Sequence, residues 1–168
     1  MTSKNITIFV LVLVGLFGLM WWGKSASVSP APTTGSNLGT QSVLSAAEKF
    51  YDFGTISMAD GEVSKTFRVT NSGTADVNLK SVTTSCMCTT AYLIGPQGEK
   101  GPFGMPGHGG AVRPANEIIK AGEGRDVKVV FDPNAHGPAG VGAIDRSIYL
   151  TDDAGDTLEL GIKVVVTP

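Results

Sequence analysis

From Ala47 onward apolar residues recur at every second position, and this alternation limits most strongly what the chain can fold into. The longest run places five apolar side chains on one face: Leu158, Leu160, Ile162, Val164 and Val166. A period of two is the spacing of side chains on one face of a β-strand. About seven such segments follow one another without a helical pattern between them, and each has one apolar face. We therefore predict an immunoglobulin-like antiparallel β-sandwich of about seven strands over residues 46–168.

Local signals add detail to this prediction. Residues 50–56 are expected to form the first strand, and Met58–Gly61 a turn. Val82 falls out of phase with Val77 and Leu79, which predicts a β-bulge near residues 80–81. Residues 152–155 (Asp-Asp-Ala-Gly) are typical of the turn of a β-hairpin that joins the last two strands.

The N-terminal region has a different character. Residues 6–22 carry no charge and as a helix would span roughly 26 Å, close to the hydrocarbon thickness of a bilayer. Trp21 and Trp22 stand where an interfacial aromatic belt is expected. We predict a transmembrane anchor over residues 1–24, with a cleaved signal peptide as the alternative. Either segment would export the rest of the chain, so the expected location is the cell membrane, single-pass, with the C-terminal domain on the extracytoplasmic side. Residues 25–45, rich in Ser, Pro, Thr and Gly, are expected to be a flexible linker.

Three stretches of the exported part resemble a known family. These are residues 52–56 (Asp-Phe-Gly-Thr-Ile), residues 67–73 (Phe-Arg-Val-Thr-Asn-Ser-Gly) and residues 85–90 (Ser-Cys-Met-Cys-Thr-Thr). Residues 121–132 are similar to its later part. Together they resemble a bacterial family of Ig-like domains of unknown function with a Ser-Cys-x-Cys-Thr motif, related to Hydin and major-sperm-protein modules. The resemblance implies an exported sandwich without an established enzymatic activity, and it covers roughly residues 48–166. The chain departs from the family by a longer insert after the motif.

Composition and missing motifs exclude several function classes. The net charge of −2 and the lack of a Lys/Arg cluster argue against a nucleic-acid partner. We find no nucleophile elbow, no phosphate-binding loop and no HExxH pattern, and so predict no enzymatic activity. The expected partners are the membrane, through the N-terminal helix, and a protein of the cell envelope. The sequence leaves the oligomeric state open.

Cys86 and Cys88, the two cysteines of the chain, are the main candidates for chemistry. On a regular strand their side chains would share a face, with Cα atoms roughly 6.6 Å apart. A disulfide needs Cβ atoms about 3.8 Å apart, so an extended pair cannot close without a kink. Two thiolates can share one metal ion at a wider spacing. If the strand is regular, the spacing therefore favours shared metal ligation.

Further ligands are expected from glycine-rich loops. Met105 and His108 lie in a Gly/Pro-rich insert at residues 95–116, and His136 lies in a later loop. Thiolate, thioether and imidazole together form a soft ligand set that favours copper, especially Cu(I). Zinc fits less well because it makes little use of a thioether. The insert begins with six Gly-first triplets, but we expect a folded loop here rather than a collagen triple helix.

Two other interpretations of the cysteines remain open. They can be buried and inert in a non-catalytic interaction module of the envelope. They can also act as a redox pair, which requires an accessible thiolate of low pKa.

Overall fold

The structure is a computed structural model that describes residues 43–107 and 113–168. The predicted anchor, most of the predicted linker and His108 lie outside these residues. Within the described residues no helix is long and apolar enough to cross a membrane. Apart from two single-turn 3-10 helices, η1 (Met58–Asp60) and η2 (Gly137–Gly140), the regular elements described are β-strands.

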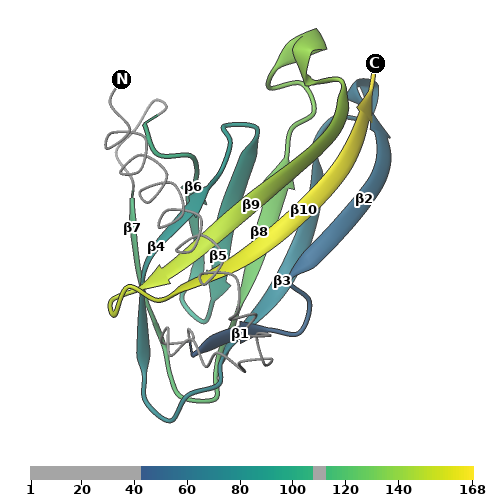
Figure 1. Cartoon of the computed structure of the whole chain (residues 1–168). Helices are drawn as coiled ribbons and strands as arrows, with labels where there is room; N and C mark the ends of the chain where they lie inside the picture. Colours follow the sequence, from purple (N-terminus) through teal and green to yellow (C-terminus); the bar gives the residue numbers. More distant parts are fainter. Residues whose placement is uncertain (1–42, 108–112) are drawn as a thin grey trace, which may run out of the picture. The chain divides into compact units, whose positions relative to one another are not determined.

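Ten strands form two five-stranded sheets (Figure 1). The first sheet has the order β1-β3-β8-β5-β6, with the bounds Leu44–Ala46, Val63–Asn71, Gly124–Phe131, Thr89–Gly95 and Gly98–Phe103. The second has the order β2-β10-β9-β4-β7, with the bounds Phe50–Ser57, Thr157–Thr167, Gly142–Asp152, Val77–Thr84 and Pro114–Ile119. The predicted all-β sandwich is thereby confirmed.

The structure corrects the expected strand count and pairing. The described residues contain ten strands rather than about seven, because β1, β6 and β7 come from segments without a clear hydrophobic alternation. The second sheet is mixed rather than antiparallel, because the first predicted strand, β2, pairs in parallel with the last strand, β10. The strand β1 also takes in Leu44 and Ser45, the last two residues of the segment predicted as linker.

The structure confirms two of the local predictions, the β-bulge and the C-terminal hairpin. The pairings of β4 with β7 and with β9 both shift register between Leu79 and Ser81, which confirms the predicted bulge. The predicted C-terminal hairpin is confirmed by the antiparallel pairing of β9 with β10. The 95–116 insert was wrongly expected to be one folded loop, since it supplies β6 and the start of β7, edge strands of opposite sheets.

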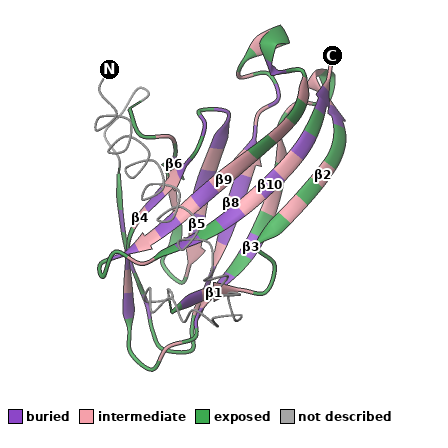
Figure 2. Ribbon diagram, viewed as in Figure 1, coloured by how far each residue is buried: buried purple, intermediate pink, exposed green. Residues whose placement is uncertain are grey.

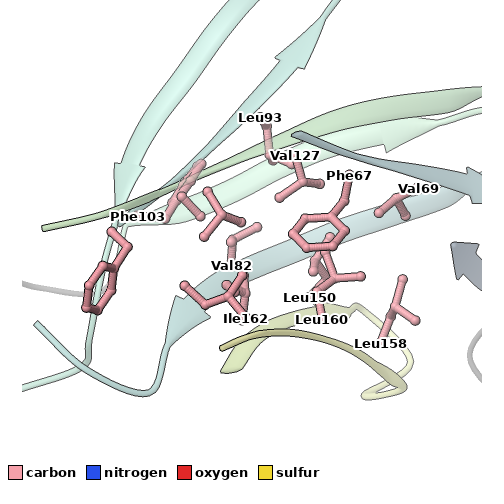
Figure 3. Packing of buried hydrophobic residues seen from close by; sticks show 14 of the residues in the cluster. Phe67, Val69, Val82, Leu93, Phe103, Val127, Leu150, Leu158, Leu160 and Ile162 are labelled. Carbon is pink, nitrogen blue, oxygen red and sulfur yellow. The ribbon is translucent and has the colours of Figure 1, made fainter. Parts of the chain in front are cut away.

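The core lies between the two sheets. Figure 2 shows buried residues alternating with intermediate or exposed ones along β10 and along the C-terminal half of β9, as the sequence pattern predicts. Figure 3 shows Phe67 and Val127 of the first sheet packing towards Leu150 and Leu160 of the second. These side chains are at most 1% exposed. The alternation thus determines which face of each sheet packs into the core. It places no such requirement on the turns at the strand ends, where a site can form.

Candidate metal or thiol site

The two cysteines lie in a tight turn between β4 and β5, not on a strand. The backbone N–H of Thr89 donates to the carbonyl oxygen of Cys86 at 3.2 Å and closes the turn. The condition behind the spacing argument, a regular strand at the cysteines, is therefore not met. The turn brings the two Sγ atoms to 2.7 Å from each other, and both cysteines are free thiols.

Hydroxyl groups beside the cysteines fix this turn. Thr84 Oγ1 is buried and lies 3.0 Å from the carbonyl oxygen of Cys86 and 2.9 Å from that of Thr89. Ser85 Oγ accepts from the backbone N–H of Ser147 on β9, and the N–H of Ser85 donates to the carbonyl oxygen of Ser147, each at 2.9 Å. The Ser and Thr residues around the cysteines thus anchor the turn to the sheet.

A histidine from a distant loop meets the turn. His136 precedes η2, and its Nε2 lies 3.1 Å from Cys86 Sγ. The two sulfurs and the imidazole nitrogen lie within 4.8 Å of one another. Both cysteines are buried, whereas His136 is exposed. The three groups form the one cluster of at least three metal-ligating His, Cys, Asp or Glu side chains among the described residues.

Of the other predicted ligands, Met105 is half-buried beyond the end of β6, and His108 lies outside the described part of the chain. His136, the histidine ranked below them, contacts Cys86. Its sequence surroundings gave no reason to prefer it, because a contact across fifty positions of sequence depends on strand order.

Arg146 on β9 is a site residue that the sequence analysis missed. Its Nε donates to Cys88 Sγ at 3.2 Å, and its NH1 donates to the carbonyl oxygen of Asp145 at 2.8 Å. An arginine in a strand is ordinary on the polar face of a sheet, so no local signal marked it. Arg146 lines a pocket of about 320 Å³ together with His136, Val141 and Ile144.

The surroundings shift the pKa values of the two thiols in opposite directions. Burial raises the pKa of Cys86, but hydrogen bonds from the Cys88 side chain and backbone, the contact with His136 and the charge of Arg146 outweigh it, so the pKa of Cys86 falls to about 7. Burial, together with the hydrogen bond to Cys86, raises the pKa of Cys88. Cys86 is thus the first of the pair to become a thiolate.

Comparison with known proteins supports a domain of unknown function. Residues 44–102, less than half of the chain, match the family model described as "Protein of unknown function (DUF1573)". This match includes both cysteines. No curated protein sequence matches the chain.

Solved structures with a similar fold belong to longer chains. A protein of unknown function from Porphyromonas gingivalis W83 is 18% identical, with a TM-score of 0.51 over 73% of this chain and 46% of that chain. The secreted serine protease VesC from Vibrio cholerae is 14% identical, with a TM-score of 0.47 over 77% of this chain and 25% of that chain. The chain thus spans less than half the length of either. The first likeness shows the two-sheet fold alone, and the second carries no further argument.

Proposed function

We propose that the domain binds a soft metal ion through Cys86, Cys88 and His136. The observation that carries this proposal is the convergence of two sulfurs and one imidazole nitrogen within 4.8 Å. Thiolate and imidazole are the donors that copper and zinc prefer. We propose copper as the ion that the domain binds, and the handling or delivery of copper as its role.

The thiols need only a small adjustment to bind an ion. Two sulfurs that each lie about 2.3 Å from a tetrahedral ion are about 3.8 Å apart. The sulfurs therefore have to separate by roughly 1 Å from their 2.7 Å contact, a distance that side-chain rotation supplies. The exposed His136 leaves the ion reachable from the pocket beside η2.

Metal removal tests this proposal. The purified protein is loaded with Cu(I) or Zn(II) under reducing, oxygen-free conditions, and the bound metal is counted after dialysis. We expect one equivalent per chain in the wild type, none in a Cys86→Ser/Cys88→Ser variant, and at least tenfold weaker binding in His136→Ala. An Arg68→Gln variant, which changes an exposed side chain paired with Asp126, is the control and should bind as the wild type does. Equal metal content in the wild type and the double serine variant would overturn the proposal.

A thiol–disulfide exchange centre is the second candidate, favoured by the pKa of about 7 at Cys86 and the sulfur 2.7 Å away. The Cys86 thiolate would attack a disulfide of a partner protein and release one partner thiolate. Cys88, after losing its proton, would then attack the Cys86 sulfur and release the second. The pair would become a disulfide and the partner a dithiol. Equilibration with glutathione buffers, followed by mass measurement, tests whether the pair reversibly loses two hydrogen atoms.

The setting of the domain is part of the proposal. We propose that residues 1–24 tether the chain to the membrane and that the sandwich, of immunoglobulin-like type, lies on the extracytoplasmic side. The uncharged run over residues 6–22 supports this placement. Cell fractionation combined with protease protection of the C-terminal domain tests it.

The cysteines are unlike inert thiols of an interaction module, because Cys86 contacts His136 and Cys88 contacts Arg146.

A further inference from the structure

Arg146 places a fixed positive charge against the proposed metal site. Its Nε is bonded to Cys88 Sγ, and its NH1 is bonded to a backbone carbonyl, so the guanidinium has a defined position. An arginine guanidinium stays protonated in proteins, so this group carries a positive charge whether or not the site holds an ion.

No acidic side chain offsets this charge among the contacts of the described residues. Arg146 is in none of the ion pairs found within residues 43–107 and 113–168. Asp132 is held close to the turn because its backbone N–H donates to the carbonyl oxygen of Cys88. The carboxylate of Asp132, however, accepts from the N–H of Asn134 and is not part of the cluster. The guanidinium is thus available to balance charge at the sulfurs.

The sum of charges then depends on the metal. Two thiolates and a neutral imidazole carry a charge of −2 together. A monovalent ion leaves −1, which Arg146 neutralises. A divalent ion leaves zero, so that Arg146 becomes an uncompensated cation beside a buried site. In a partly buried site of low dielectric constant, this uncompensated charge lowers the affinity for the divalent ion.

We propose that Arg146 makes the site selective for a monovalent soft cation, Cu(I), over divalent Zn(II). This inference rests on the metal site proposed above and needs no ligand from Met105. At an effective dielectric constant near 20, one extra unit of charge about 5 Å away changes an affinity by roughly 300-fold. Partial exposure of Arg146 to solvent lowers this effect, so we expect a change of about 10- to 100-fold in the ratio of the two affinities.

Three variants of the full-length chain test the inference. Arg146→Gln removes the charge and keeps an N–H donor, and Arg146→Lys keeps the charge and loses the planar donor group. Arg68→Gln is the matched control, because Arg68 is exposed on β3 and pairs with Asp126, not with a thiol. Affinities for Cu(I) and Zn(II) are measured by competition with chromophoric chelators under oxygen-free conditions. Thermal unfolding of each metal-free variant shows that the fold is kept.

The expected and the contradicting results are distinct. We expect the ratio of Cu(I) to Zn(II) affinity to fall about 10- to 100-fold in Arg146→Gln, to stay within about threefold of wild type in Arg146→Lys, and not to change in Arg68→Gln. A ratio in Arg146→Gln within twofold of wild type would overturn the inference and leave the metal site standing. An equal fall in both Arg146 variants would assign the effect to the hydrogen bond and overturn the role of charge. If the wild type binds neither ion, the proposed function itself fails. Should Arg146→Gln not fold, the result for Arg146→Lys decides, since a fall of tenfold or more there contradicts the inference and an unchanged ratio supports it.

Discussion

The two thiols of the β4–β5 turn have different surroundings although one residue separates them. Cys86 receives hydrogen bonds from the Cys88 side chain and backbone and contacts His136, while Cys88 is more deeply buried, at 2% exposed against 9%. A thiolate is the reactive form of cysteine. The order in which the pair loses protons is therefore built into the turn, with Cys86 first.

This order predicts how the thiols react with pH. In the metal-free, reduced protein, alkylation by iodoacetamide should modify Cys86 before Cys88, and its rate should rise through a midpoint near pH 7. The pKa of Cys86 is lowered, so the reactive thiolate is lost as the pH falls below that midpoint. Replacement of His136 by Ala removes one of the contacts that lower the pKa and should move the midpoint upward. Peptide mass mapping of the modified residue checks both expectations, and preferential labelling of Cys88 would contradict them.

At the scale of the elements, β7 is held to the opposite sheet by a buried ion network. Glu117 on β7 accepts from Arg125 on β8 and from Lys100 on β6, each at 2.6 Å. Arg125 NH2 also donates to the carbonyl oxygen of Ile118 at 2.8 Å. The network connects edge strand β7 of one sheet with β8 and β6 of the other and closes this border of the sandwich.

Removal of one partner from this network should destabilise the domain. Glu117→Gln removes the nearer and more buried of the two carboxylates that pair with the buried Arg125, since Glu123 stays at 3.3 Å, and we expect a loss of about 2–4 kcal/mol in the free energy of unfolding. Asp126→Asn, which breaks an exposed pair with Arg68, is the control and should cost less than about 1 kcal/mol. Urea unfolding at pH 7 measures both.

The same network makes the stability of the domain depend on pH. Burial raises the pKa of Glu117, but hydrogen bonds from Lys100 and Arg125 outweigh it, so its pKa lies below the ordinary value of 4.5. The carboxylate therefore contributes stability above pH 4.5, and this contribution is lost as the pH falls through the lowered pKa. The difference between wild type and Glu117→Gln should shrink below pH 4.5. A difference that stays constant down to pH 3 would contradict this account.

The elements also show how far sequence reasoning reached. The apolar alternation predicted β3, β8, β9 and β10, because most of their inward residues are hydrophobic. It missed β7, a short strand in which one of three inward positions is the charged Glu117, and it missed β6, whose sequence is rich in Gly and Pro. The site was only half predicted. The cysteines stood out as a pair, but the contacts of His136 and Arg146 with them depend on which strand ends meet, a long-range property.

At the scale of the whole molecule, the apolar core lies between the two sheets. Leu160 is fully buried on β10, while Val165 on the same strand is 37% exposed. We expect Leu160→Ala to lower the free energy of unfolding by about 3–5 kcal/mol, since it leaves a cavity. Val165→Ala should cost less than about 1 kcal/mol. Denaturant unfolding of the metal-free protein measures both, and equal losses would contradict the placement of the core.

The four residues of the site come from three separate parts of the chain: the β4–β5 turn, the loop before η2, and β9. In an unfolded chain the two cysteines are neighbours, but the imidazole of His136 and the guanidinium of Arg146 come close to them only when the two sheets have formed. If the domain binds a metal ion as proposed, the ion can bind only after folding, and the bound ion would then connect the turn with the loop before η2.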